Sequence, residues 1–195
     1  MTAQDFRGAA TRSAPRRRAE IRRNHLRYRL AVVAGTAADV VRHAGGWLCD
    51  RTMAGWEVTV VLADSRDADA VEILGASVLD LDTSLGAAVH DPWPHALAVA
   101  TDLFTADPRV RAGLLDCLDN GRAEVVMWGE VVPPSLDDRL DTVHHRISVA
   151  AQTFKDCALA AVGLPVVTGE VSEQFRCGEL LVTGAWGATD LVSIG

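Results

Sequence analysis

The stretch from Leu30 to Asp64 constrains the fold more than any other part of this sequence. It begins with the apolar run LAVVAG, continues as TAADVVRHAGGWLCDRTMAGW with apolar residues at helical spacing, and ends with the β-branched run EVTVVLAD. Two strands joined by a helix of this length predict a parallel crossover, because antiparallel strands need only a short turn. We therefore predict a β-α-β unit in a parallel sheet, with Gly55 ending the helix.

Similar patterns predict the elements that follow. A short acidic helix, RDADAVEILG, leads through Gly75 into a third strand, ASVLDLD, and the apolar run AEVVMWGE predicts a buried central strand. Between them, HALAVATDLF and PRVRAGLLDCLDNG are predicted to form one broken helical stretch. Pro108 suits a helix start and Gly121 a helix end.

The longest helix is predicted to run to about Val162, capped by Ser135 or Asp137. A helical wheel places His144 beside its apolar stripe and His145 on its polar side, so these histidines are not expected to act as a catalytic pair. We interpret them as one packing and one surface histidine. The stripe consists of Leu140, Val143, Ile147, Ala151, Phe154 and Ala158.

Together these elements predict an α/β fold of three-layer, Rossmann-like type, with a mostly parallel sheet and helices on both faces. We expect a basic flexible arm at 1–29, an α/β domain at 30–164 and a glycine-rich C-terminal extension at 165–195. Short β-like pieces in the extension could add edge strands or pair with a second copy of the chain, which leaves a homo-oligomer open.

Composition narrows the class of protein. With 195 residues, 49% of them hydrophobic, the chain can bury a full core. No apolar run reaches the roughly 20 residues that cross a bilayer, and the first residues lack the apolar segment of a secretory signal. We therefore expect a cytoplasmic protein with no transmembrane segment. The four cysteines form no C-x-x-C pair and are expected to be reduced.

Charge is distributed unevenly along the chain. Residues 1–29 hold nine arginines against two acidic residues, a net charge of +7, whereas the remainder carries −14. Because an acidic body repels nucleic acid, contact with nucleic acid, an anionic membrane or an acidic partner would have to come from the arm. The alternatives are a solvated tail, association of the arm with the acidic body, or a start codon assigned too far upstream.

The first strand-to-helix turn, AGTAAD, is the main candidate binding site. Ligands of open parallel sheets bind at the carboxyl ends of the strands, where helix N-termini attract anions. The candidate binding residues are Gly35, Thr36, Ala37 and Asp39, since small residues let a phosphate or carboxylate approach the backbone. The pattern is not G-x-G-x-x-G, and tight strand-to-helix packing also requires small residues.

Two acidic residues are expected at the same edge of the sheet. Asp64 ends the second strand, where dinucleotide-binding folds place the acid that receives ribose hydroxyls, although a helix cap is the alternative. Glu130 follows the strand VVMWG beside Trp128 and is the candidate catalytic acid or base. No nucleophile or P-loop lysine is recognisable, and no particular cofactor is indicated.

Two segments contain residue types that bind metal ions. The segment HDPWPH brings together His90, Asp91 and His95, but no further ligand follows in register. Asp80 and Asp82 form a D-x-D whose side chains would share one face of a strand, and an acidic strand end is the alternative. Neither segment by itself establishes a metal site.

The run VVAGTAADVVRHAGGWLCDRTMAGWEVTVVLAD resembles two families in layout. It is similar to flavoprotein decarboxylases of the pantothenate pathway, in which a G-S-x-A-A turn precedes a helix and an A-G-x-E-V-x-V-V strand, but their P-A-x-A-N-T flavin segment is missing. Through AGG and AGWEVTVV it also resembles LmbE-like zinc deacetylases. That resemblance implies a zinc-binding H-P-D-D, whose positions hold Thr36, Ala37, Ala38 and Asp39, so only Asp39 could be a retained ligand.

Two hypotheses about function follow. In the first, the domain binds a small anionic or nucleotide-like ligand at the turn from Gly35 to Asp39, with Asp64 and Glu130 as polar contacts. In the second, the chain is a non-catalytic interaction or regulatory protein that uses the arm and the C-terminal extension, with the α/β body as scaffold. The sequence does not decide whether the chain is an enzyme.

Overall fold

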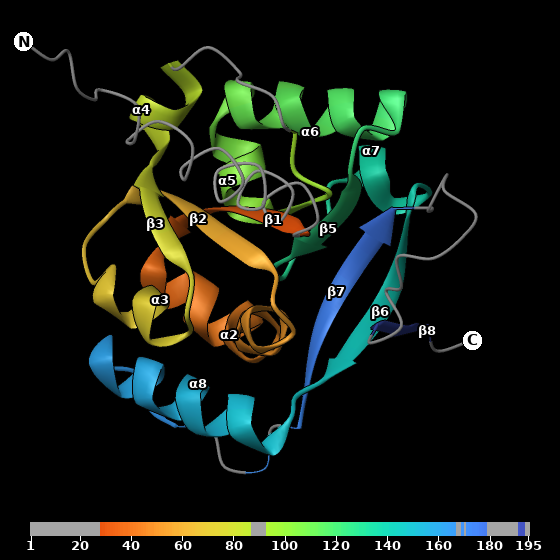
Figure 1. Cartoon of the computed structure of the whole chain (residues 1–195). Coiled ribbons are helices and arrows are strands. Elements are labelled where there is room, and N and C mark those ends of the chain that lie inside the picture. The colour runs from red at the N-terminus through yellow and green to blue at the C-terminus, as the bar shows by residue number, and fades with distance from the viewer. Residues whose placement is uncertain (1–27, 87–92, 167–168, 170, 179–190, 194–195) are drawn as a thin grey trace, which may run out of the picture.

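A computed structural model describes residues 28–86, 93–166, 169, 171–178 and 191–193 of the chain. Its centre is one eight-stranded sheet with the strand order β3-β2-β1-β4-β5-β7-β6-β8 (Figure 1). The first five strands in this order are parallel, and each of the last three pairs antiparallel with its neighbours. The α/β class is therefore confirmed, but the sheet is mixed, and the Rossmann-like description fits only its parallel part.

The predicted β-α-β unit is confirmed, with helix α2 (Ala37–Met53) between its strands and Gly55 just after it at a φ of 88°. The parallel strands are β1 (Arg29–Thr36), β2 (Glu57–Asp64), β3 (Ser77–Asp80), β4 (Ala96–Ala100) and β5 (Glu124–Trp128). The antiparallel strands are β6 (Leu140–Arg146), β7 (Ser172–Gly178) and β8 (Leu191–Ser193).

Helices cover both faces of the sheet (Figure 1). As predicted, Pro108 begins α6, and Gly121 follows it in the left-handed conformation. One face carries α2, α3 (Asp69–Ile73) and α8 (Val149–Ala161), and the other carries α4 (Leu81–Gly86), α5 (Thr101–Ala106) and α6 (Pro108–Asn120). The short helix α7 (Pro134–Asp137) leads into β6.

Two segments predicted as helices contain strands instead. The segment ALAVA forms β4 between β1 and β5, because an alanine-rich run buried on both faces fits a central strand as well as a helix. The predicted longest helix is divided into α7, β6 and α8. Ser148, rather than Ser135 or Asp137, caps the long helical part, since its side chain accepts a hydrogen bond from the Ala151 N–H at 3.1 Å.

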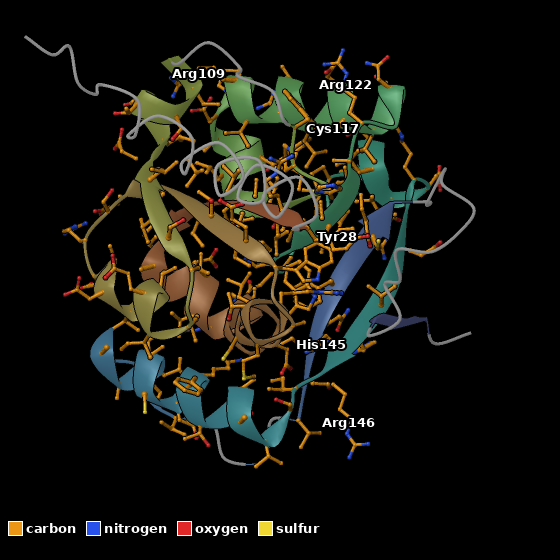
Figure 2. All side chains as sticks on the ribbon, in the orientation of Figure 1. Tyr28, Arg109, Cys117, Arg122, His145 and Arg146 are labelled. Carbon is orange, nitrogen blue, oxygen red and sulfur yellow. The ribbon has the colours of Figure 1, made fainter. Side chains whose placement is uncertain are left out.

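The assignment of the adjacent histidines to a helix is consequently wrong. In β6 successive side chains point to opposite faces, so His145 is buried and His144 is half-buried. The Nε2 atom of His145 lies 2.8 Å from Oδ2 of Asp50 in α2 (Figure 2). The predicted D-x-D is also divided, because β3 ends at Asp80 and Asp82 belongs to α4.

The C-terminal extension contributes an inner strand of the sheet. β7 lies between β5 and β6, and β8 pairs with β6 at the edge. The predictions about the arm concern residues that the structure does not describe, except Tyr28 and Arg29. Tyr28 packs against Trp56, with ring centroids 5.1 Å apart. Within the described part of the chain, no helix is long and apolar enough to cross a membrane. All four cysteines are free thiols, three of them buried.

Candidate functional site

The chain changes sides of the sheet between β1 and β4. β1 continues into α2 on one face, whereas its neighbour β4 continues into α5 on the other (Figure 1). At such a topological switch point the two connections diverge and leave a crevice outside the carboxyl ends of the strands, where α/β proteins bind ligands. The end of β5, the next strand in the sheet, lies beside this point.

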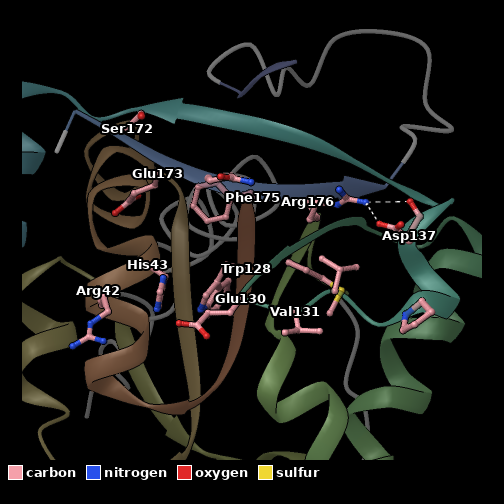
Figure 3. Close-up of a pocket in the computed structure, with 15 residues that line it drawn as sticks. Arg42, His43, Trp128, Glu130, Val131, Asp137, Ser172, Glu173, Phe175 and Arg176 are labelled. Carbon is pink, nitrogen blue, oxygen red and sulfur yellow. Dashed lines mark hydrogen bonds and ion pairs between the residues drawn. The ribbon is translucent and has the colours of Figure 1, made fainter. Parts of the chain in front are cut away.

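A cleft of about 800 Å³ opens beside α2 at this edge (Figure 3). Its walls come from α2, from the end of β5 with the loop after it, from α7 and from β7, and it combines charged groups with an apolar floor. Its volume lies within the range of roughly 300–1,000 Å³ typical of small-molecule sites. The lining residues are Arg42, His43, Met127, Trp128, Gly129, Glu130, Val131, Val132, Pro134, Asp137, Ser172, Glu173, Gln174, Phe175 and Arg176.

Asp39, in the first turn of α2, joins the helix to β5. Its Oδ2 accepts a hydrogen bond from the indole N–H of Trp128 at 3.1 Å, and its Oδ1 lies 3.7 Å from Nε2 of His43. Burial raises the pKa of the Asp39 carboxyl above its ordinary value, whereas the Trp128 hydrogen bond and His43 lower it by favouring the charged form. The three side chains form a polar cluster at the end of β5.

The turn before Asp39 is occupied by local contacts. The Thr36 side chain caps α2 by accepting a hydrogen bond from the Asp39 N–H at 3.2 Å, and Ala37 is fully buried. The carboxylate of Asp39 itself lies in the first turn, where it complements the positive end of the helix dipole. Gly35, Thr36, Ala37 and Asp39 are not among the residues that line the cleft, so ligand contact with them stays a prediction.

Glu130 is the predicted candidate that lies in the cleft directly. It follows β5 after Gly129 and is exposed. Gly129 has a φ of 136°, and a Cβ there would overlap the hydroxyl of Thr101. The Thr101 hydroxyl is buried and has no hydrogen-bond partner among the described residues. The backbone that presents Glu130 therefore passes tightly over the start of α5.

Arginines border the cleft on two sides. Arg42, on α2, is exposed next to His43. On the opposite wall the Arg176 guanidinium donates a hydrogen bond to Oδ1 of Asp137 at 2.7 Å (Figure 3). It also donates to Oγ1 of Thr142 at 3.0 Å. Because Arg176 is held by these acceptors, Arg42 is the cation with more freedom to meet a ligand.

Two other predicted candidates lie outside the cleft. Asp64 is paired with Arg66, whose side-chain hydrogen bonds lower the pKa of Asp64 to about 2. His95 lies at the opposite end of the parallel strands, where its Nδ1 accepts a hydrogen bond from the Arg29 N–H at 3.1 Å. His90 and Asp91 lie outside the described residues, so the proposed cluster with His95 stays a prediction.

The residues at the turn do not fit a zinc ion. Zinc sites in proteins use three or four protein ligands, usually Cys, His, Asp or Glu. Within the described ranges, no group of three or more such residues is placed to hold a metal ion. Of the implied H-P-D-D only Asp39 is present, and one of its oxygens already accepts the Trp128 hydrogen bond.

Sequence reasoning missed several residues of this site. His43 follows Asp39 by four residues on a helix, a spacing that puts the two side chains on one face and could have identified the pair. Arg42 lies beside it. Arg176 and Phe175 enter from β7, 130 positions later in the chain, and no local pattern in the sequence predicts that long-range contact.

Comparisons place this fold among solved structures of deacetylases and a hydratase. No protein-family model and no curated protein matches the sequence. The A40926 pseudoaglycone deacetylase Dbv21 is 16% identical, with a TM-score of 0.55 over 81% of this chain and 100% of that one. A deacetylase of teicoplanin biosynthesis, solved with teicoplanin, is 14% identical, with a TM-score of 0.54 over 76% and 97%.

The 4-carboxy-2-hydroxymuconate hydratase GalB from Pseudomonas putida is 14% identical, with a TM-score of 0.53 over 82% of this chain and 99% of that one. At these identities the likeness concerns the fold. It supports the resemblance to LmbE-like deacetylases on the level of architecture, while the residues of the turn differ from that family's motif.

Proposed function

We propose that this chain binds a small anionic molecule of about nucleotide size in the cleft beside α2. Arg42 holds the anionic group, and Glu130 accepts hydrogen bonds from hydroxyl or amino groups of the same ligand. The observation that carries this proposal is the cleft itself, which lies next to the topological switch point and gathers charged side chains from α2 and from the end of β5.

The apolar floor supports a ligand with a ring or another flat apolar part. Trp128, Phe175 and Met127 form the buried base of the cleft, and Val131 and Pro134 present exposed apolar side chains to it. Apolar surface of this kind contributes most of the binding free energy of small ligands. The known activities of proteins with this fold favour an enzymatic role. If the ligand is converted, Glu130 and His43 are the groups placed to move protons.

A thermal-shift screen with mononucleotides, sugar phosphates and dicarboxylates tests the proposal. A ligand present at 100 times its Kd stabilises the folded state by about 2.7 kcal/mol, which is easily detected. We expect Arg42→Ala to weaken binding of a hit by at least about tenfold, which corresponds to about 1.4 kcal/mol. Arg122→Ala, which removes an exposed arginine before the amino end of β5 and outside the cleft lining, is the matched control.

The variant Gly35→Val distinguishes ligand binding in the cleft from ligand binding at the predicted turn. A Cβ at position 35 meets nothing within 4 Å, so we expect this variant to fold normally. Loss of binding in Gly35→Val would locate the ligand at the turn, whereas loss in Arg42→Ala alone supports the cleft. If no compound of the three classes stabilises the protein, the proposal fails and the interaction-protein hypothesis gains support.

A further inference from the structure

Three of the four positions of the implied zinc motif, Thr36, Ala37 and Ala38, hold no usual zinc ligand in this chain. Thr36 caps α2 through its side-chain oxygen, a task that histidine performs poorly. Ala37, the first residue of α2, is fully buried, and Ala38 has no side-chain atom that could bind a metal. The turn thus has the backbone of a strand-to-helix connection but lacks the side-chain atoms that would bind zinc at positions 36–38.

The fourth position, Asp39, could bind a metal ion, but its carboxylate is hydrogen-bonded to Trp128 instead. Its Oδ2 accepts the indole N–H of Trp128 at 3.1 Å. The charged groups that face it are Arg42 and His43 on its own helix and Asp102 on α5. Asp39 and His43 would give a metal ion two ligands at most, and no third His, Cys, Asp or Glu among the described residues completes a site.

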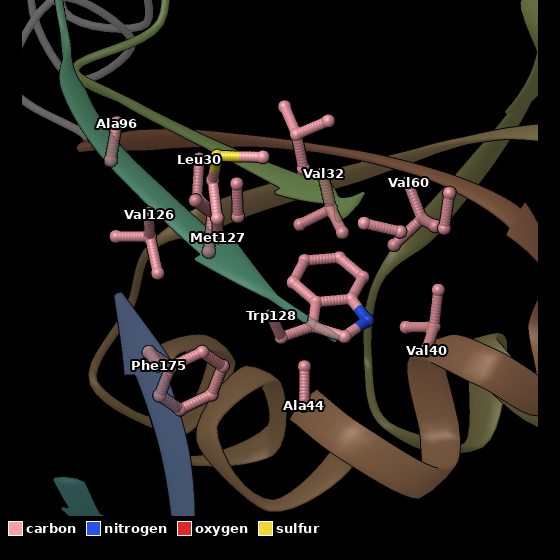
Figure 4. Close-up of a cluster of buried hydrophobic side chains, with 14 of the residues drawn as sticks. Leu30, Val32, Val40, Ala44, Val60, Ala96, Val126, Met127, Trp128 and Phe175 are labelled. Atoms are coloured by element: carbon pink, nitrogen blue, oxygen red, sulfur yellow. The ribbon is translucent and has the colours of Figure 1, made fainter. Parts of the chain in front are cut away.

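Trp128 is held firmly in this position. It is 2% exposed, its strand β5 is paired on both sides, and the residue is in register with Ala100 of β4. Figure 4 shows its indole ring among core side chains, with the ring nitrogen directed toward the beginning of α2 near Val40. Rotating the ring away would leave a void in a close-packed core.

We infer that the indole N–H of Trp128 replaces a metal ion as the partner of Asp39, so that this carboxylate, beside the cleft that Trp128 and His43 line, is held by a hydrogen bond and not by zinc. Trp128 is then a positioning residue, and Oδ1 of Asp39 is the atom left to accept a hydrogen bond from a ligand hydroxyl or ammonium group. This inference rests on the proposed function, because it concerns the same cleft.

Zinc titration of the full chain, after dialysis against a chelator, tests the first part of the inference. We expect calorimetry to show no one-to-one zinc binding that depends on Asp39, so the wild type, Asp39→Ala and the control Asp138→Ala should behave alike. Asp138 is exposed and lies outside the cleft. Stoichiometric zinc binding that weakens about tenfold or more in Asp39→Ala, but not in Asp138→Ala, would overturn the inference.

Hydrogen exchange of the indole N–H tests the second part. In a protein labelled with ¹⁵N, the Trp128 resonance is assigned from its loss in Trp128→Phe. We expect its exchange to accelerate at least about tenfold in Asp39→Ala and to remain slow in Asp39→Asn, whose amide oxygen can still accept the hydrogen bond. The indole N–H of Trp47, which is buried and has no hydrogen-bond partner among the residues that the structure describes, is the internal control. Equal exchange in wild type and Asp39→Ala would refute the positioning role.

The two proposals fail in different ways. A ligand that stabilises the wild type equally with and without chelator supports both. A protein that binds zinc through Asp39 and also binds a small anionic ligand would refute this inference and leave the proposed function in place. A protein that binds neither zinc nor any ligand of the screen would refute the proposed function while the Asp39–Trp128 contact could still be confirmed by exchange.

Discussion

Gly129 is the residue whose backbone conformation the cleft depends on most. Its φ of 136° lies in a region that residues with a Cβ rarely adopt, and a Cβ there would overlap the Thr101 hydroxyl. The next residue is Glu130, and the preceding one is Trp128. A glycine at this point therefore lets the chain leave β5 sharply and place one side chain in the core and the other in the cleft.

We predict that Gly129→Ala lowers the free energy of unfolding by at least about 2 kcal/mol, through backbone strain and overlap with Thr101. Gly35→Ala is the matched control, because its Cβ would enter open space, and it should change stability by less than about 1 kcal/mol. Urea unfolding followed by circular dichroism measures both. Equal stability of the two variants would contradict the close approach of Gly129 to Thr101 and the backbone conformation described for Gly129.

The thiols differ in reactivity because they differ in burial. Cys157 is exposed on α8. Burial raises the pKa of Cys49 to about 11 and that of Cys177 to about 12, the latter with help from the charge of Glu124. Since the thiolate is the reactive form, we predict that iodoacetamide at pH 8 modifies one site per native chain, and that Cys157→Ser abolishes it. Mass spectrometry of the intact protein measures this, and rapid labelling of Cys49 or Cys177 would contradict it.

At the scale of elements, a buried ion pair ties α8 and β7 to the middle of α2. Nζ of Lys155 lies 2.9 Å from Oε1 of Glu173, and both side chains are almost completely buried. The Glu173 carboxylate also accepts hydrogen bonds from the backbone N–H groups of Gly46 and Trp47 at 2.8 and 2.7 Å. Gly46 also lets the Ile147 side chain pack against α2, because a Cβ at position 46 would lie 2.6 Å from it.

We predict that Lys155→Met lowers the free energy of unfolding by about 3–5 kcal/mol, because it leaves the Glu173 carboxylate buried without its cation. The double variant Lys155→Met with Glu173→Gln should be more stable than the single variant, since the unpaired charge is gone. Urea unfolding at pH 7 measures both. A double variant that is less stable than Lys155→Met would contradict this explanation.

The same pair predicts how the single variant responds to pH. Burial raises the pKa of Glu173 above its ordinary value, so the folded state takes up a proton more readily than the unfolded state. Stability associated with this group therefore increases as the pH falls through the folded-state pKa. In Lys155→Met, which lacks the opposing cation, the loss of stability should be smaller at pH 5 than at pH 7.

Elements that depend on local pattern were predicted, and elements that depend on distant partners were not. The unit β1-α2-β2 follows from apolar spacing and glycine positions within one stretch. The strands β4 and β6 were mistaken for helix, because an alanine-rich run and a segment with apolar residues three or four apart satisfy both patterns. Their strand character comes from pairing with β1 and β5, and with β7, which are far away in the sequence.

For the candidate site as well, the residues that follow from the order of the elements could be predicted, and their distant partners could not. Asp39 and Glu130 could be proposed because the carboxyl edge of a parallel sheet follows from the order of the elements. The partners that give Asp39 its present role, Trp128 and His43, required the structure, because the Trp128 contact joins residues 89 positions apart. Arg176 reaches the cleft only because β7 inserts between β5 and β6.

At the scale of the whole molecule, the described body begins at the first strand. The Tyr28 carbonyl accepts a hydrogen bond from the Glu57 N–H at 2.8 Å, and β1 starts at Arg29. Because residues 1–29 are expected from the sequence to form a flexible arm, we predict that removing residues 1–27 changes the free energy of unfolding by less than about 0.5 kcal/mol. Urea unfolding of the full and shortened chains measures this, and a loss above about 1.5 kcal/mol would show that the arm belongs to the fold.

The separation of charge between the basic arm and the acidic body also predicts which part of the chain would bind nucleic acid. Any binding should disappear when residues 1–27 are removed and should weaken steeply with salt, because it would come from arginine contacts with phosphates. Binding that persists in the shortened chain would assign nucleic-acid recognition to the body instead. The residues that line the cleft lie between Arg42 and Arg176, so ligand binding can be measured in the shortened chain as well.

We propose that the cleft beside α2 binds a small anionic ligand next to an Asp39–Trp128 pair that needs no metal ion. The indole N–H resonance of Trp128 reports on it most directly, because this group touches Asp39 and its ring lines the cleft. We predict that a ligand from the screen shifts this resonance in a saturable manner, while zinc leaves it unchanged. A resonance that responds to zinc and to none of the ligands would contradict the claim.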